Sequence, residues 1–83
     1  HLGYKYNNPN KVSDIVLAKK TKNIDLIIGG HTHTLLDKPT EIKNIVNNNV
    51  IINQVGCFGT HLGRIDFHLN NDTKYYSSQI LSI

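Results

Sequence analysis

The feature that most constrains the fold is an apolar segment that ends in two glycines and is followed by two histidines. The sequence IDLIIGGHTHTLL spans residues 24–36 and places His31 and His33 directly after Gly29 and Gly30. Its apolar run is too short and too rich in β-branched residues for a helix, so it predicts a strand that is buried on both faces. We therefore expect an α/β fold with a pair of imidazoles at the carboxyl end of a buried strand.

The segment before this strand predicts a helix. Apolar residues recur at intervals of three and four between Val12 and Ala18. Ser13 or Asn10 can cap the N-terminus, and Asp14 would lie near the positive end of the helix dipole. We expect a short helix from about Ser13 to Thr21.

The chain beyond residue 39 predicts a β meander. Its candidate strands, separated by NNN, GCFG and NND, are 41–45, 50–55, 63–69 and 74–81. The asparagine-rich turns at 47–49 and 70–72 suit hairpins, because Asn and Asp tolerate positive φ. In segment 63–69, apolar and polar residues alternate, which predicts one packed face and one polar face. The predicted fold class is α/β, with one helix, one buried strand and then a β meander in a single domain over residues 1–83.

Composition and charge exclude several classes of protein. The chain has 83 residues, 39% of them hydrophobic and 18% charged, which is typical of a small globular domain. No apolar run approaches the ~18 residues of a membrane span. The net charge is +3, but the lysines are scattered, and the one cluster, Lys19, Lys20 and Lys22, lies where a helix end favours cations, so nucleic acid is not an expected partner. A single cysteine, Cys57, excludes an internal disulfide.

The two histidines suit a metal site. In an extended backbone, residues two apart point to the same side, and neutral imidazoles are good ligands for zinc, iron, nickel or manganese. His1 also precedes a glycine, in HLG, and a helix between two parallel strands would bring it near His31 and His33. Composition alone leaves metal binding and a pair of loop histidines as equal alternatives, and it leaves His1 open as an unrelated terminal residue.

Three motifs in this order carry a family resemblance. HLG, IDLIIGGHTHT and INQVGCFGTHLGRIDF follow one another along the chain, and the resemblance that they carry extends over essentially all 83 residues. Together they resemble the C-terminal portion of the catalytic domain of calcineurin-like metallophosphoesterases, and more narrowly the branch of 5′-nucleotidases and 2′,3′-cyclic phosphodiesterases. The narrower branch is indicated by the pattern Q-x-G-x-x-G-x-x-L-G-R-x-D, which fits Gln54, Gly56, Gly59, Leu62, Gly63, Arg64 and Asp66.

This resemblance implies a fold, a reaction and a set of ligands. The fold would be part of a four-layer metallophosphoesterase β-sandwich, and the reaction would be hydrolysis of nucleotide phosphate esters by a water that two divalent ions, such as zinc or manganese, activate. His1 and His31 would bind one metal and His33 the other, while Thr32 and Thr34 would shape the loop. The resemblance also favours a periplasmic or extracellular location.

Other ligands of that family's site do not occur in residues 1–83. The chain contains no Asp-x-His motif early in the domain, where the family has it, no bridging aspartate in a matching motif and no Gly-Asn-His element. Three neutral imidazoles cannot offset the repulsion between two divalent ions. We therefore expect residues 1–83 to be inactive alone, with no catalytic residue beyond the metal ligands, and to require the remainder of the catalytic domain as a partner.

Two alternatives remain at this point: a non-catalytic scaffold or binding module of the same fold, and a general phosphodiesterase or nuclease.

The sequence predicts minor roles for the other polar candidates. We expect a structural role near the site for His61, an exposed position for His68, a packing role for Cys57, and structural roles for Gln54 and Arg64. Asn71-Asp72-Thr73 forms a glycosylation sequon, a pattern that is common by chance.

Overall fold

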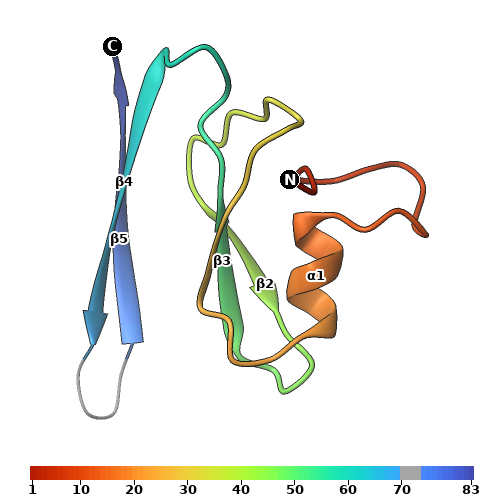
Figure 1. The fold of residues 1–83 in the computed structure, drawn as a ribbon. Helices are drawn as coiled ribbons and strands as arrows, with labels where there is room; N and C mark the ends of the chain where they lie inside the picture. Colours follow the sequence, from red (N-terminus) through yellow and green to blue (C-terminus); the bar gives the residue numbers. More distant parts are fainter. Residues whose placement is uncertain (70–73) are drawn as a thin grey trace.

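Three layers lie side by side in the computed structural model, which describes residues 1–69 and 74–83 (Figure 1). Helix α1 lies against one side of a three-stranded sheet of order β1-β3-β2, and a separate hairpin of β4 and β5 lies on the other side. The elements are α1 (Asp14–Lys20), β1 (Leu26–Ile28), β2 (Thr40–Lys43), β3 (Asn49–Asn53), β4 (His61–Leu69) and β5 (Lys74–Ser82). The chain is thus a small mixed α/β domain, compatible with part of a sandwich.

Helix α1 begins and ends where its capping residues predict. Ser13 is extended, with φ −136°, and its hydroxyl accepts a hydrogen bond of 3.2 Å from the amide of Val16. This bond satisfies one of the amides that a helix N-terminus leaves unpaired. Lys19 and Lys20 occupy the last turn, and Thr21 follows as the C-cap. The predicted helix is confirmed, with Ser13 and not Asn10 as its cap.

The strand that is buried on both faces is β3, not the segment at 24–28. Val50, Ile51 and Ile52 are all buried, because β3 is the central strand of its sheet, between β1 and β2, with α1 on one side of the sheet and the β4–β5 hairpin on the other (Figure 1). In β1, by contrast, Leu26 and Ile27 are half-buried and Ile28 is 79% exposed. The prediction for this segment was wrong about burial, because β1 lies at the edge of the sheet while α1 packs over β2 and β3.

The hydrophobic core lies between α1 and the inner face of this sheet. Ala18, Val50 and Ile52 are fully buried at its centre. Around them pack the half-buried side chains of Tyr4, Ile15, Ile24, Ile27 and Ile42. This core fixes the position of α1 over β3.

The four C-terminal strands are divided between two sheets, so the predicted continuous meander is wrong. β4 pairs with β5, and β3 pairs with β1 and β2. The loop between β3 and β4 turns the chain into the next layer through three residues at positive φ: Gly56 (78°), Phe58 (61°) and Gly59 (65°). Glycine adopts such angles without strain, which explains the glycines of GCFG.

The turn between β2 and β3 has the predicted asparagine chemistry. Asn47 has a φ of 64°, and the side-chain oxygen of Asn44 accepts hydrogen bonds from the amides of Val46 and Asn48. The second predicted turn, at 70–72, and the sequon at 71–73 lie outside the described residues.

The two sheets approach each other closely at a glycine of β4. A Cβ on Gly63 would lie 2.8 Å from Cγ1 of Val55, too close for a real contact. Farther along the hairpin, Oη of Tyr76 donates a 2.9 Å hydrogen bond to Oε1 of Glu41 in β2. The expected alternation in β4 holds for Ile65 and Phe67, which are half-buried, but Leu69 is 70% exposed.

Candidate metal centre

Two histidines project from a tight loop that directly follows β1. This histidine loop (residues 29–34) starts with the amide of Gly29, which donates to the carbonyl of Asn53 and so continues the pairing of β1 with β3. His31 and His33 have φ angles of 67° and 56°, both in the left-handed region. The expectation that an extended backbone aims both rings to one side is therefore wrong, because the loop coils on itself here.

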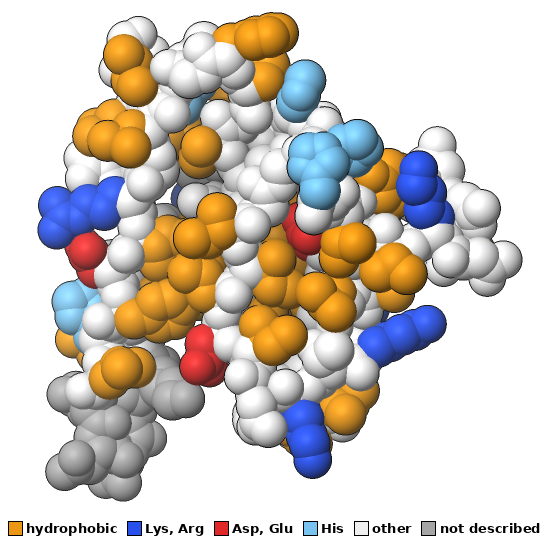
Figure 2. Space-filling model, viewed as in Figure 1, with side chains coloured by type: hydrophobic (Ala, Val, Ile, Leu, Met, Phe, Trp, Pro, Cys, Tyr) orange, Lys and Arg blue, Asp and Glu red, His pale blue; other side chains and the backbone are white. Residues whose placement is uncertain are grey.

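The ring of His31 lies against the ring of His1, thirty positions earlier in the chain. The two ring centroids are 4.4 Å apart, with the planes inclined by 60°. Figure 2 shows adjoining histidine side chains, in pale blue, on this face near the N-terminus. Two imidazoles that hold one zinc ion tetrahedrally, at Zn–N distances of ~2.0–2.1 Å, have ring centroids roughly 5.2 Å apart. The observed 4.4 Å is slightly shorter than this spacing, and the predicted proximity of His1 to His31 is confirmed.

The position of His1 is set by hydrogen bonds of the loop that follows it, not by a strand. The carbonyls of Gly3 and Tyr4 accept from the amides of Asp14 and Ile15, at 2.8 and 3.2 Å. Residues 1–3 are not part of a strand. The first turn of α1 thereby holds the N-terminal loop next to the histidine loop.

His33 lies apart from this pair, beside an aromatic ring. Its ring centroid is 6.0 Å from that of Phe58, whose side chain is 90% exposed. Within residues 1–69 and 74–83, no three His, Cys, Asp or Glu side chains are grouped so that they could hold a metal ion. The structure brings His1 and His31 together, and the assignment of His33 to a second metal stays a prediction.

A hydroxyl network joins the two histidine-bearing loops. Thr32 Oγ1 accepts a 3.0 Å hydrogen bond from the amide of Tyr4 and lies 2.9 Å from Oγ1 of Thr34. The amide of Thr34 donates a 2.6 Å bond to Oε1 of Gln54, which is buried at the end of β3 and also contacts Oγ1 of Thr32 at 3.4 Å. Thr32, Thr34 and Gln54 thus shape the loop structurally, as the sequence predicts.

Asp14 is a buried carboxyl beside this network that the sequence did not single out. It is 4% exposed, and its Oδ2 has no hydrogen-bond partner. A Cβ on Gly29 would collide with that same oxygen. Burial raises the pKa of Asp14. The sequence indicated only its place at the helix N-terminus, because its other neighbours come from distant segments.

The remaining candidates have the structural surroundings that the sequence predicts. Nδ1 of His61 lies 2.9 Å from Oγ1 of Thr60, and His68 is exposed and stacks on Tyr75 at 4.6 Å. Arg64 forms an exposed ion pair with Asp66 at 3.0 Å, while Cys57 is a half-buried free thiol. None of these contacts involves His1, His31 or His33.

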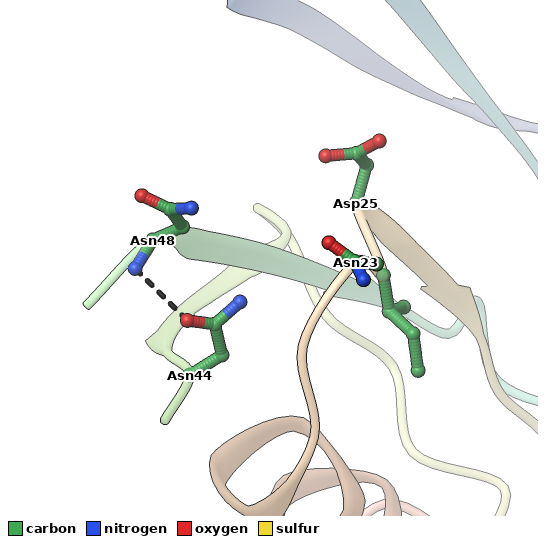
Figure 3. A pocket seen from close by; sticks show the side chains of 5 residues that line it. Asn23, Asp25, Asn44 and Asn48 are labelled. Atoms are coloured by element: carbon green, nitrogen blue, oxygen red, sulfur yellow. Dashed lines mark hydrogen bonds between the residues drawn. The ribbon is translucent and has the colours of Figure 1, made fainter. Parts of the chain in front are cut away.

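A polar pocket of about 280 Å³ lies before β1, at the end of the strand away from the histidine loop. It is lined by Asn23, Ile24, Asp25, Asn44 and Asn48 (Figure 3). Asn44 points its oxygen to the amide of Asn48, so its role there is to hold the turn. The pocket has no histidine or thiol in its lining and does not extend the candidate metal centre.

Comparison with curated proteins gives a relative for much of the chain. Over 55 residues, 64% of the chain, it is 54% identical to the trifunctional nucleotide phosphoesterase protein YfkN of Bacillus subtilis (strain 168), and the match covers 4% of that protein's length. No family model matches the chain, and no solved structure does. No helix in the described part of the chain is long and apolar enough to cross a membrane.

Proposed function

We propose that residues 1–83 are part of the catalytic domain of a metal-dependent nucleotide phosphoesterase of the calcineurin-like type. The contact between the rings of His1 and His31 is the observation that carries this proposal. A pair of loop histidines without a function gives no reason for two rings from distant segments to lie with their centroids 4.4 Å apart. The sequence likeness to a nucleotide phosphoesterase agrees with it.

The residues of the chain would act mainly by holding ligands in place. His1 and His31 would donate ring nitrogens to one ion. His33, which follows Thr32 in the chain, would bind the second ion. Two divalent ions, when bound, activate a water for in-line attack on phosphorus and stabilise the charge on the phosphoryl oxygens. The network of Thr32, Thr34 and Gln54 fixes the loop backbone, which keeps the imidazoles oriented.

The carboxylates that such a centre needs would come from the remainder of the domain. Imidazoles are neutral ligands, so without a bridging carboxylate nothing offsets the repulsion between two cations. The fragment is therefore proposed to be inactive by itself, with nucleotides or other phosphate esters as substrates of the complete domain. A periplasmic or extracellular location is part of this proposal and is tested by cell fractionation.

The deciding experiment is a phosphatase assay of the full-length polypeptide that carries these residues. With Mn²⁺ or Zn²⁺ and a 5′-nucleotide, we expect activity that His31→Ala lowers by at least ~100-fold, since a metal ligand is lost. His68→Ala is the matched control, because His68 is exposed on β4 and stacks only on Tyr75. Full activity of the His31→Ala protein would refute the assignment.

The same assay separates the proposal from its alternatives. A protein that binds zinc through His31 but hydrolyses no phosphate ester would be a scaffold of the same fold. Hydrolysis of a phosphodiester or a nucleic acid with no preference for nucleotides would indicate a general phosphodiesterase or nuclease.

A further inference from the structure

Asp14 lies between the two loops that carry His1 and His31. Its amide donates to the carbonyl of Gly3, two positions after His1, and its carboxylate lies against Gly29, two positions before His31. Gly29 makes this possible by having no side chain, since a Cβ there would overlap Oδ2 of Asp14.

The carboxylate of Asp14 is buried without satisfying its hydrogen-bonding capacity. The residue is 4% exposed, and no donor from the described residues reaches Oδ2. Leaving a buried carboxylate oxygen unpaired is costly, and a group of this kind in a native protein calls for a partner. Ring N–H groups of histidines that bind metals are such partners, since these histidines usually donate their second nitrogen to a carboxylate or a carbonyl.

We propose that Asp14 is a positioning residue of the candidate metal centre, whose carboxylate accepts a ring N–H from the His1–His31 pair. This inference rests on the proposed function. When an ion binds one nitrogen of each ring, a ring N–H that turns towards Asp14 fixes the tautomer and the orientation of that imidazole. The same bond would satisfy Oδ2 and raise the basicity of the ligating nitrogen.

Gln54 is the competing partner within reach. Its Nε2 lies 3.3 Å from the position that a Cβ of Gly29 would take, so a small movement could pair it with Asp14. If Gln54 is the partner, the carboxylate serves the fold and not the metal. The two cases predict different melting temperatures for Asp14→Asn in the absence of metal.

The test uses zinc as the probe and the full-length polypeptide carrying these residues. Asp14→Asn is expected to weaken zinc affinity, measured by competition with a chelator, by 10- to 100-fold. It is expected to leave the melting temperature in EDTA unchanged or raised, because the amide removes a buried charge. In the Co²⁺-substituted protein, the d–d absorption bands should shift in Asp14→Asn. Asp66→Asn, which breaks only an exposed ion pair, is the control and should change neither zinc affinity nor the bands.

Glycine substitutions give a second, independent measurement. Gly29→Ala should weaken zinc binding by displacing the carboxylate, whereas Gly30→Ala should not, since a Cβ on Gly30 meets nothing within 4 Å. Neither glycine has a positive φ, so alanine brings no backbone strain at either position. In a protein that already carries Asp14→Ala, Gly29→Ala should have no further effect.

Three results would decide against the inference or its premise. A lower melting temperature of Asp14→Asn in EDTA, with zinc affinity unchanged, would show that the carboxylate pairs with Gln54 in the fold. This result would overturn the positioning role. Unchanged affinity in Asp14→Asn together with loss of binding in His31→Ala would also overturn it while leaving the metal centre intact. Unchanged zinc affinity in His31→Ala would instead refute the proposed function.

Discussion

His31 and His33 both have backbone angles that an L-residue with a side chain seldom adopts. Their φ values of 67° and 56° lie in the left-handed region, and Thr32 separates them. Such residues cost of order 1 kcal/mol each, and they persist where the surrounding structure holds them. Here the hydroxyl of Thr32, which accepts from the amide of Tyr4, and the side-chain oxygen of Gln54, which accepts from the amide of Thr34, provide that restraint. The loop thus keeps two bulky rings where glycines would be less strained.

This strain gives a prediction at His33. His33→Gly is expected to have a higher free energy of unfolding than His33→Ala, by about 1 kcal/mol, because alanine keeps the Cβ that makes positive φ unfavourable. Urea unfolding of the two variants measures the difference. At His68, in the strand β4, the order should be reversed, since glycine weakens regular structure. A more stable His33→Ala would contradict the left-handed conformation.

At the residue scale, sequence reasoning recovered the histidines but not their chemical surroundings. His1, His31 and His33 stand in recognisable motifs, and Gln54 was assigned a structural role before its hydrogen bonds were known. Asp14 was not singled out because the residues that it contacts near the candidate site, Gly3 and Gly29, lie in distant segments that no sequence pattern connects to it. The extended backbone at His31 was also wrong, since the φ angles are imposed by loop contacts with Tyr4 and Gln54.

Among the elements, α1 is the one whose first and last residues are set most by neighbouring residues in the chain, with Ser13 as N-cap and Thr21 as C-cap. It has only 7 residues, too short to be stable alone, so its cap and its packing on β3 both matter. The hydroxyl of Ser13 bonds the amide of Val16, and the carbonyls of Gly3 and Tyr4 accept two further amides of the first turn. The same contacts hold the N-terminal loop, so the helix end and the position of His1 are coupled.

The N-cap of α1 gives a prediction in which Asn10→Ala is the control for Ser13→Ala. Ser13→Ala should lower the free energy of unfolding by ~1 kcal/mol, because it leaves the amide of Val16 without its partner in a buried setting. Asn10→Ala, at the other residue that sequence reasoning allowed as a cap, should change it by less than ~0.5 kcal/mol. Chemical denaturation of both variants tests this. Equal losses in the two would mean that the hydroxyl of Ser13 does not cap α1.

The strands show where local patterns stop being informative. The period-two pattern and the asparagine turn at 47–49 located β2 to β5 to within a few residues, because these signals act between neighbours in the chain. Burial of β1 was misjudged because an apolar run such as LII is equally compatible with the centre and the edge of a sheet. Which strand lies at the centre is decided by pairing between distant segments, here by β3.

On the scale of the whole molecule, the two sheets are joined by a side-chain bond between β5 and β2. Tyr76 donates to Glu41, and burial together with this hydrogen bond and the negative charge of Glu41 raises the pKa of the Tyr76 hydroxyl. A raised pKa means that folding favours the protonated phenol. The stabilisation is therefore fully present below the ordinary pKa of tyrosine and is lost as the pH rises through the raised value.

This coupling predicts a titration difference. Glu41→Gln should lower the pKa of Tyr76 partway towards its ordinary value, because the charge of Glu41 is removed while burial remains. The ultraviolet absorbance of tyrosinate, taken as the difference between proteins with and without Tyr76→Phe, measures this pKa. An unshifted pKa of Tyr76 in Glu41→Gln would show that the two sheets are not joined by this bond.

The molecule also exposes more surface than its mass requires. Its accessible area is 5958 Å², whereas a compact monomer of 9.4 kDa has about 5000 Å². Large apolar side chains contribute to the excess, among them Ile28, Phe58 and Ile83, which are 79%, 90% and 84% exposed. This surplus agrees with the proposal that the 83 residues belong to a larger domain.

The central place of β3 has a consequence for the order of folding. β2 and β3 are joined by a short turn and can pair early, but β1 has no partner until β3 exists, although it precedes both in the chain. Chain segments that must wait for distant partners order late and open first. The loop with His31 follows β1 directly, so under the proposed function metal ligation would be coupled to the closing of this sheet edge, and an ion bound there would slow unfolding more than it speeds folding.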